Sequence, residues 1–485
     1  MENNNPSTSW PRRRFLAGLG AGGLLLASGS RLRAAESSDV LVLGAGLSGL
    51  NTALLLQEMG YRVTVLEASS HVGGRVQTRT FGGIRHELGA SDIGALYARV
   101  LDMATRLELP VVPASISVRG FSYHVGGKLL AESDWEGADV NRTVGDERAI
   151  PPTRLESHFI NALNPLRELD DWLKPEFARL DISLAEFLRS NGVSTAAIDL
   201  IGQTYNGNNV DRSSALAILR DATRQRYGFE AWKQMRAAGM DIAPLREIEG
   251  GNQRLPEAMA AKLEREVRFG QAAALVEQDA SGVSVTCMDG SRHRGDLLVC
   301  TVPLPALRDV EFRPGLSAVK NAAAVEGEYY ATTKFYLRPK TKFWENDGLA
   351  ASMWTDGPVE RVFAMTDAND EVHTLLVWIN GAGGRRIDQL EPEAAKALVL
   401  EQMARMRPAS KGQLEVVGYH AWGRTPFIGG CGLSFAAGQV SRLAADLPAA
   451  EGRIHFAGEH TRRSEFGMES AMESAERVAQ EILSL

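Results

Sequence analysis

The sequence has few cysteines: only Cys287, Cys300 and Cys431 occur among its 485 residues. So small and odd a number excludes a fold built on a framework of disulfides. Long hydrophobic runs are also missing beyond the first few dozen residues. No other stretch approaches the roughly 20 apolar residues that a membrane-spanning helix needs, so no stable membrane anchor is expected.

A clustered stripe of Lys and Arg is lacking too, and the 53 basic residues are outnumbered by 60 acidic ones. Because nucleic-acid binders carry such a stripe, nucleic acid is not expected as a partner. Internal repeats and low-complexity linkers are absent. What remains is a globular composition, with 44% apolar residues, long enough for two or three domains with cores of their own.

The first 35 residues differ from the rest of the chain. Arg-Arg-Arg-Phe-Leu at 12–16 leads into a short apolar, Gly-rich run, and Ala34 and Ala35 follow. This order predicts a secretory signal of the twin-arginine type, with a mitochondrial-type presequence or a weak membrane anchor as the alternative. The twin-arginine machinery, which carries folded proteins, is thus an expected partner, and the mature chain is expected in the periplasm or outside the cell. Removal of residues 1–35 leaves a net charge of −11.

A strand–turn–helix–strand unit begins at Asp39. Residues 39–43 and 62–66 are short apolar strands with a helical pattern between them. The turn carries the glycines of a G-x-G-x-x-G pattern, Gly44, Gly46 and Gly49. They permit a tight turn, the approach of a pyrophosphate and close packing of the helix on the strand. Glu67 would accept hydrogen bonds from the adenosine ribose, so the unit predicts a site for NAD or FAD and not for NADP.

Periodicity predicts further strands and helices. Alternation around Gly126-Gly127 indicates a hairpin between about 116 and 130, and about 155 to 245 is mostly helical. A helix is expected from about Met468 to the C-terminus. Further strands are expected at 283–287, 296–302, 333–337 and 374–379.

Short motifs decide between the two cofactors. Gly73-Gly74-Arg75 follows Glu67 closely, and Ala457-Gly458-Glu459 precedes a helix start at Gly467-Met468-Glu469. At these residues the chain resembles the flavin-containing amine oxidase family, and the resemblance covers nearly all of residues 38–485. It implies FAD as cofactor and an α/β fold, in which a dinucleotide-binding (Rossmann-like) FAD domain is joined to a substrate domain of mixed sheet and helices.

The resemblance implies that both domains are discontinuous in the sequence. After the signal peptide of residues 1–35, three segments would build the FAD domain: 36–112, 246–322 and 425–485. Two segments would build the substrate domain: 113–245 and 323–424.

The resemblance also assigns residues to the cofactor. They are Gly73, Gly74, Arg75, Val267, Gly458, Glu459 and Met468. Val267 would contact adenine through its backbone, and Glu459 would lie by the ribityl chain and phosphates. Met468 would present its N–H to the flavin O2, where a helix N-terminus stabilises the negative charge of reduced flavin.

Lys334 and Trp422 are the candidate catalytic residues. Lys334 matches the family lysine that holds a water against flavin N5, where a cation helps reduced flavin pass electrons to dioxygen. Trp422 begins a stretch, 422–432, that resembles the monoamine oxidases. In those enzymes the Cys after Gly-Gly attaches the flavin covalently, so Cys431 is either an attachment point or a buried structural thiol, and the sequence leaves both open.

The candidate substrate residues are Asp92, Phe427, Gly432, Phe466 and Gly467. Monoamine oxidases flank the amine with two aromatic residues where this chain has the two glycines, which favours a bulkier or differently angled substrate. The two phenylalanines would supply aromatic walls from neighbouring positions. Asp92 stands where L-amino-acid oxidases commonly carry an arginine for the substrate carboxylate. It would attract a cationic amine, or else merely cap the helix that follows.

The reaction implied is oxidation of an amine carbon–nitrogen bond to an imine, which water hydrolyses to a carbonyl compound and ammonia or a smaller amine. The electrons then pass to dioxygen, giving peroxide, or to another acceptor. No Ser/His/Asp or metal-ligand arrangement is present, so neither a dedicated base nor a metal is expected. An L-amino-acid oxidase of the same superfamily is the main alternative, followed by a flavin desaturase and a non-catalytic FAD-binding scaffold.

Overall fold

The computed structural model describes residues 38–485, apart from 116–119, 206, 241 and 368. The predicted signal peptide, residues 1–35, lies outside the described residues. Among the helices described, none combines the length and the apolar character needed to cross a membrane.

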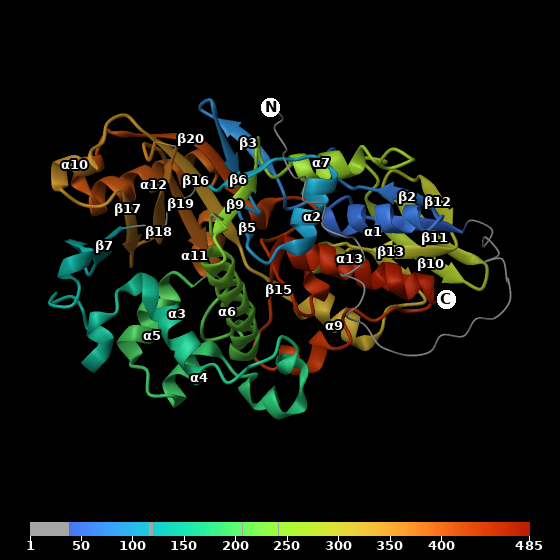
Figure 1. Ribbon diagram of the computed structural model, residues 1–485, viewed down its shortest axis with the longest axis horizontal. Coiled ribbons are helices and arrows are strands. Elements are labelled where there is room, and N and C mark those ends of the chain that lie inside the picture. Colours follow the sequence, from blue (N-terminus) through green and yellow to red (C-terminus); the bar gives the residue numbers. More distant parts are fainter. Residues whose placement is uncertain (1–37, 116–119, 206, 241, 368) are drawn as a thin grey trace, which may run out of the picture. The chain divides into compact units, whose positions relative to one another are not determined.

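Four parallel strands form the sheet of the dinucleotide-binding unit. Its order is β2-β1-β13-β22, with β1 Asp39–Leu43, β2 Arg62–Leu66, β13 Leu297–Cys300 and β22 Ile454–Phe456. Alternate residues of these apolar strands enter two separate cores, so both faces of the sheet are covered. Helices α1 (Leu47–Glu58) and α13 (Gly467–Leu483) pack against each other there (Figure 1). The prediction of an α/β fold with a Rossmann-like FAD domain is confirmed.

Two glycines of the first turn are required by the fold itself. Gly44 has a φ of 102°, in the left-handed region that favours glycine. A Cβ on Gly49 would lie 1.9 Å from the carbonyl oxygen of Gly44, a distance that no side chain tolerates. The close approach of α1 to the turn therefore depends on glycine at 49.

The structure contains a second large sheet, which has seven strands. Its order is β20-β16-β19-β18-β17-β7-β8, with β7 Phe121–Val125, β8 Lys128–Ala131, β16 Thr332–Pro339, β17 Ser352–Thr355, β18 Arg361–Thr366, β19 Val372–Asn380 and β20 Leu414–Ala421. One face, which includes Phe335, packs on α11 (Gly381–Asp388) and α12 (Pro392–Met406). Because side chains alternate along a strand, Lys334 and its cross-strand partner Trp378 project from the other face.

The remaining α-helices of the described residues lie in the segments that connect these strands. They are α2 Ala98–Arg106, α3 Pro152–Leu163, α4 Leu184–Ser190, α5 Thr195–Gln203, α6 Ala215–Ala237, α7 Arg254–Ala260, α8 Leu304–Leu307, α9 Ala318–Glu326 and α10 Trp344–Asp347. The smaller sheets contain β3 Thr78–Phe81, β4 Ile84–Glu87, β5 Ile93–Gly94, β6 Val111–Pro113, β9 Leu245–Ile248, β10 Ala273–Asp279, β11 Gly282–Cys287, β12 Arg292–Gly295, β14 Glu311–Arg313, β15 Glu328–Tyr329 and β21 Leu433–Ser434.

Most predicted elements are present, with shifted ends. The hairpin is confirmed as β7 and β8, although residues 116–119 lie outside the described part of the chain. The helical stretch ends before the strand β9. The strand predicted at 296–302 is shorter, since β13 stops at Cys300 and the Thr301 hydroxyl donates to the carbonyl of Leu43 at 2.7 Å. The domain boundaries remain a prediction.

Candidate active site

A cavity of about 1210 Å³ lies at the carboxyl ends of β1, β2 and β13. Gly44, Glu67 and Thr301 directly follow these strands, and all three line the cavity. Ligands of open α/β sheets bind at this edge. The volume exceeds the roughly 300–1,000 Å³ of most small-molecule pockets, so it suits a dinucleotide together with a second small molecule.

One end of the cavity has the features of a phosphate site. Helix α1 begins there with Gly46 as its N-cap, and no side chain caps the helix. Gly46 lines the cavity, and nothing lies within 4 Å of the place where its Cβ would stand. The N–H groups of the first turn and the positive end of the helix dipole therefore face open space that favours an anion.

Glu67 is buried beside this turn. Its carboxylate accepts hydrogen bonds from the backbone N–H of Ala45 at 2.7 Å and from that of Ser69 at 2.8 Å. A carboxylate has about four acceptor positions, so some remain for a ligand. The proposed bonds to ribose hydroxyls stay a prediction that this position permits.

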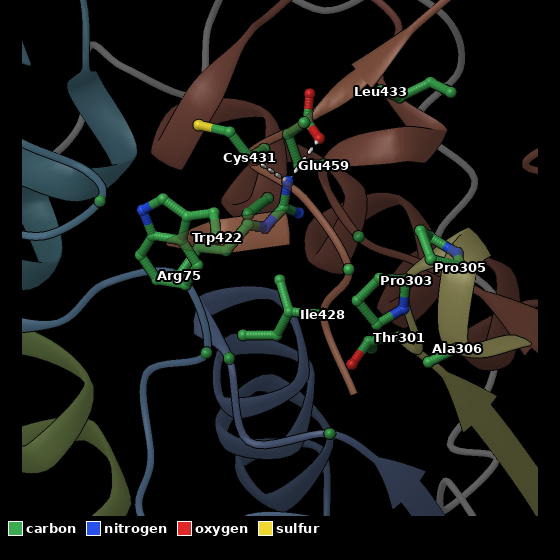
Figure 2. A pocket seen from close by; sticks show the side chains of 18 of the residues that line it. Arg75, Thr301, Pro303, Pro305, Ala306, Trp422, Ile428, Cys431, Leu433 and Glu459 are labelled. Carbon is green, nitrogen blue, oxygen red and sulfur yellow. Dashed lines mark hydrogen bonds and ion pairs between the residues drawn. The ribbon is translucent and has the colours of Figure 1, made fainter. Parts of the chain in front are cut away.

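Arg75 belongs to a buried chain of charges. Its Nη1 donates to the carbonyl of Cys431 at 2.8 Å and pairs with Glu459 at 3.1 Å, and Glu459 pairs with Arg462 at 2.9 Å. Burial opposes ionisation of Glu459, but Arg75 and Arg462 together hold its pKa below the usual value. Figure 2 shows Arg75 facing Glu459 next to Cys431. A charged contact with the cofactor is thus available where Gly74 and Gly458 also line the cavity.

A second helix N-terminus, that of α13, faces the cavity. Gly467 and Met468 line it, and no side chain caps the helix. Gly467 has a φ of 60°, and a Cβ there would lie 2.9 Å from the hydroxyl of Tyr97. Both the backbone conformation and the contact with Tyr97 therefore disfavour a larger residue at 467.

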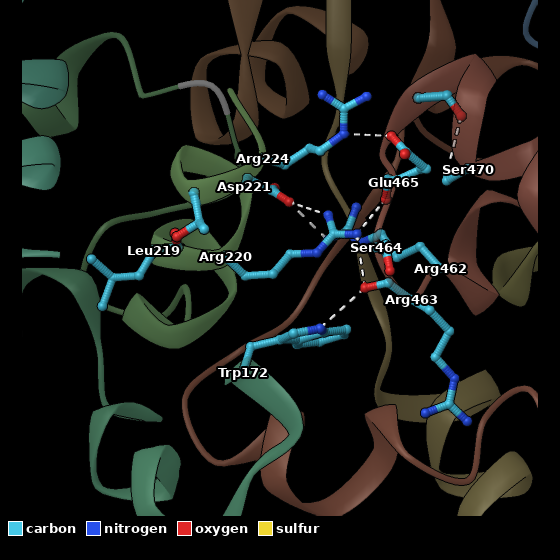
Figure 3. A network of polar contacts seen from close by, with 12 residues as sticks. Trp172, Leu219, Arg220, Asp221, Arg224, Arg462, Arg463, Ser464, Glu465 and Ser470 are labelled. Atoms are coloured by element: carbon cyan, nitrogen blue, oxygen red, sulfur yellow. Dashed lines mark hydrogen bonds and ion pairs between the residues drawn. The ribbon is translucent and has the colours of Figure 1, made fainter. Parts of the chain in front are cut away.

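Helix α6 holds the segment that precedes α13. Arg220 donates to the carbonyl oxygens of Arg463 and Glu465, and Arg224 pairs with the Glu465 carboxylate at 2.5 Å (Figure 3). The Arg224 guanidinium also lies 5.7 Å from the ring centre of Phe466. These contacts fix the position at which α13 begins.

Lys334 is buried and borders a hollow different from the main cavity. Its Nζ donates to the carbonyl of Glu87 at 3.3 Å and lies 4.2 Å from the ring centre of Trp378. Trp378 lines the main cavity, whereas Lys334 lines a side cavity of about 40 Å³, a volume that accommodates about one water molecule. Burial lowers the pKa of Lys334 to about 8, an effect that Cys431, Glu87 and Asp92 partly offset. The lysine therefore exchanges its proton around pH 8, well below the usual range of a lysine.

Trp422 and Cys431 both line the main cavity. Trp422 is fully buried, and its Nε1 donates to the carbonyl of Leu88 at 2.9 Å. Cys431 is partly exposed and is a free thiol, as are the other two cysteines. Its accessible position leaves covalent attachment of flavin a prediction.

Asp92 also lines the cavity. It accepts a hydrogen bond from the Ser91 hydroxyl at 3.2 Å, and burial raises its pKa, against which this bond and the charge of Lys334 act. The capping alternative is wrong: the next helix, α2, begins only at Ala98, and the backbone N–H groups of Arg99 and Val100 in its first turn donate to the Glu469 carboxylate at 2.9 and 3.2 Å. Asp92 is therefore free to face a ligand.

Two tyrosines that the sequence analysis missed shape the substrate end of the cavity. A Cβ on Gly432 would lie 3.3 Å from the ring of Tyr330, just as one on Gly467 would meet Tyr97. Tyr97 packs edge-on against Phe466, with ring centres 5.9 Å apart. Aromatic rings from elsewhere in the sequence thus fill the space beside both glycines.

Two predicted residues lie at or beyond the edge of the site. Phe427 lines the cavity but is 44% exposed, which places it at the rim. Val267 is not among the residues that line the cavity, and its adenine contact stays a prediction. It packs against the core that covers β1 and β2, and the chain reaches the cavity only at 271–274.

A sequence model described as flavin containing amine oxidoreductase matches residues 47–483. The chain belongs to this family. FAD is therefore its cofactor, and the resemblance inferred from the motifs is confirmed.

Relatives of this flavin amine oxidoreductase act on different substrates. The L-amino-acid oxidase of Siganus canaliculatus is 26% identical over 479 residues, which cover 92% of this chain and 85% of the relative. The nicotine dehydrogenase of Pseudomonas putida is 28% identical over 460 residues, 92% of this chain and 88% of the relative. The solved structure of putrescine oxidase bound to putrescine has a TM-score of 0.74 at 22% identity, covering 92% and 99% of the two chains. The solved structure of cyclohexylamine oxidase from Brevibacterium oxydans has a TM-score of 0.72 at 21% sequence identity, and the match covers 92% of this chain and 100% of that one.

The residues of this flavin amine oxidoreductase fit FAD. Two helix N-termini face the same cavity, at Gly46 and at Gly467, and each stabilises negative charge. The pyrophosphate of FAD is anionic, and its flavin ring becomes so on reduction. The open space at Gly46 and the spare acceptor positions of Glu67 suit the pyrophosphate and the ribose.

Proposed function

We propose that this flavoenzyme oxidises amines in preference to α-amino acids. The observation that carries the proposal is Asp92, a carboxyl group that lines the main cavity, whereas Lys334, the cation whose charge acts on it, lines the side cavity. Of the three arginines that line the cavity, Arg75 and Arg462 are paired with Glu459, and Arg308 donates to a backbone carbonyl. An acidic group in a partly desolvated cleft attracts a cationic amine and repels a carboxylate.

Relatives named for amines support this reading, among them nicotine dehydrogenase and the putrescine and cyclohexylamine oxidases. The relatives named L-amino-acid oxidases favour the alternative, an L-amino-acid oxidase. The residues around the substrate decide between the two, because the fold is common to both groups.

FAD, when bound, would supply the two-electron acceptor for the hydride from the carbon next to the nitrogen; with one proton lost from the nitrogen to solvent, the amine would become an imine that water hydrolyses. Asp92 would hold the charge of the incoming amine. Tyr97, Phe466 and Tyr330 would orient its apolar part. Lys334 would place a cation near the point where electrons leave for dioxygen or another acceptor.

Substrate preference tests the proposal. Each of several amino acids is compared with its decarboxylated amine by the initial rate of flavin reduction. We expect the amines to react faster, and Asp92→Asn to reduce that preference about tenfold to hundredfold, the value of one charge in a partly desolvated site.

Ser91→Ala serves as the matched control, because it removes only the hydrogen bond to Asp92 and keeps the charge. A consistent preference for amino acids would overturn the proposal. A preference for amines that Asp92→Asn leaves intact would keep the function and remove Asp92 as its cause.

We also propose that Cys431 attaches the flavin covalently, since its thiol is free and lines the cavity. Acid-precipitated protein should then keep its yellow colour, and Cys431→Ser should release the flavin into the supernatant. Flavin that washes out of the wild-type protein would show that the thiol is only packed there.

The N-terminal segment supports a proposal of export through the twin-arginine pathway. The pathway reads a pair of guanidinium groups, so Arg12→Lys with Arg13→Lys should retain the protein in the cytoplasm, as measured by fractionation of the cells. Arg14→Lys is the control, because it leaves the pair intact. Unchanged export of the double variant would refute the assignment.

A further inference from the structure

The side cavity of about 40 Å³ is lined by ionisable side chains from three strands. They are Lys334 on β16, Arg85 and Glu87 on β4, and Glu247 on β9. Lys334 is only 1% exposed, whereas Arg85 is exposed. Ser91 lines both this cavity and the main one. The side cavity therefore extends from the buried lysine towards the protein surface, and Ser91 is a wall that it shares with the main cavity.

The ammonium group of Lys334 has donors to spare for a water molecule in the side cavity. One of its three N–H groups bonds the carbonyl of Glu87 at 3.3 Å, and the described residues offer it no other hydrogen-bond acceptor. The cavity accommodates about one water molecule. The charge of Lys334 also acts on Asp92 and Cys431, which line the main cavity. Lys334 thus lies between the side cavity and the main one.

The carboxyl group of Glu87 is half-buried and is not paired with a cation among the described residues. It accepts the Thr78 hydroxyl and the backbone N–H of Asn252, both at 2.9 Å. Burial raises the pKa of Glu87 to about 7, and the charge of Glu247 adds to this rise. The two hydrogen bonds and the charge of Lys334 partly offset it. A carboxyl group with this pKa binds and releases a proton near neutral pH.

Glu247 is the second carboxyl group of the side cavity. It accepts the backbone N–H of Ser115 at 3.4 Å, and it too forms no ion pair within the described part of the chain. Burial raises its pKa, while the Ser115 bond and the charge of Arg85 act in the opposite direction. Along one cavity, the charge of Arg85 thus reaches Glu247, that of Glu247 reaches Glu87, and that of Lys334 reaches Glu87.

Reoxidation of a flavin oxidase consumes a proton. Reduced flavin that carries one hydrogen and one negative charge gives two electrons and that hydrogen to dioxygen, and one further proton completes hydrogen peroxide. FAD with an amine or its product would fill the main cavity and exclude water from it. A proton that reaches the flavin at this stage therefore needs a passage other than the substrate entrance.

We propose that the side cavity is this passage: Glu247 takes a proton from solvent near Arg85, and Glu87 passes it to a water molecule beside Lys334. The proposal rests on the proposed function, in which dioxygen accepts the electrons. Each transfer moves one proton between oxygen atoms, so neither carboxyl group is oxidised or reduced. Both return to their starting state once the proton has passed.

Reoxidation of enzyme that has been reduced by light, with no amine present, tests the inference. Stopped-flow absorbance follows the flavin after mixing with dioxygen. Glu87→Gln and Glu247→Gln should each slow reoxidation at least about tenfold, somewhat less than the loss of a direct proton donor, which costs about 10²–10⁴. Added acetic acid should restore part of the rate in both variants. Glu249→Gln is the matched control, because this exposed residue of the same segment lines neither cavity.

Infrared difference spectra of the flavin-free protein give a readout independent of turnover. The band of a protonated carboxyl group should appear as the pH falls through about 7, and Glu87→Gln should lack it. Absence of this band from the wild-type protein would overturn the inference. Wild-type reoxidation rates in both variants would overturn it too, as would equal slowing of reoxidation and of flavin reduction by an amine. Because light replaces the substrate, a failure to oxidise any amine would refute the proposed function and leave this test in force.

Discussion

Replacement of Lys334 by methionine should slow reoxidation of the reduced enzyme by dioxygen about a hundredfold, and slow reduction by substrate far less. The ammonium is buried against Trp378 with only the Glu87 carbonyl as hydrogen-bond acceptor among the described residues. Such a preorganised charge acts where negative charge develops, and removal of one group of this kind typically reduces a rate by about 10²–10³. Stopped-flow absorbance follows the two half-reactions separately.

The same experiment has a pH signature. The pKa of Lys334 is lowered to about 8, chiefly by burial, so the lysine is charged below that pH and neutral above it. Reoxidation of the wild-type enzyme should therefore decline as the pH rises through about 8, and the methionine variant should lack this step. Lys320→Met is a control, because Lys320 is equally buried but pairs with Glu451 outside the cavity. Equal slowing of both half-reactions would contradict the proposed role.

Gly46→Ala and Gly49→Ala should separate cofactor binding from folding. The Gly46 backbone has a φ of −76°, which alanine adopts, and no protein atom lies near its Cβ position, so the protein without flavin should keep its stability. The new methyl group would occupy the space that faces the pyrophosphate. Added FAD should then no longer raise Tm in this variant, as binding does for the wild type.

Gly49→Ala should instead destabilise the protein whether or not FAD is present, by about 1–3 kcal/mol, because its Cβ overlaps the Gly44 carbonyl. Gly137→Ala is the control: it is exposed, with nothing within 4 Å of the Cβ position. Retention of full FAD affinity by Gly46→Ala would exclude the phosphate site at this turn. Both variants are scored by thermal unfolding with and without FAD.

Local signals in the sequence predict the first part of the cofactor site well. The apolar strand, the glycine turn and Glu67 lie within 30 residues, and their geometry follows from glycine conformation and helix–strand packing. Pairing between distant segments carries no such signal. The parallel bridge between Leu66 and Arg268, which brings a distant segment beside Glu67, is one such pairing, and the adenine contact of Val267 in that segment stays a prediction.

On the substrate side of the cavity, the sequence predicts strands and candidate residues, but it does not predict how they are arranged. The strands that contain Lys334 and Trp378 were expected, but their register, which places the two side chains together, depends on pairing that periodicity does not reveal. The effect of glycine at 432 and 467 on the substrate stays a prediction, and Tyr97 and Tyr330, which lie next to these glycines, come from other parts of the sequence. Only the folded structure shows that Tyr330 lies next to Gly432 and that Tyr97 lies next to Gly467.

The FAD sheet has an implication for biosynthesis. Its strand β22 and the helix α13 follow all the other described elements along the chain, whereas β1, α1 and β2 come first. Because β22 pairs with β13 and α13 packs against α1, a nascent chain lacks one strand of the FAD sheet and one of the two helix N-termini until α13 has been made. Uptake of FAD into the complete site must therefore follow the synthesis of α13, and deletion of that helix alone would remove the second helix N-terminus that faces the cavity.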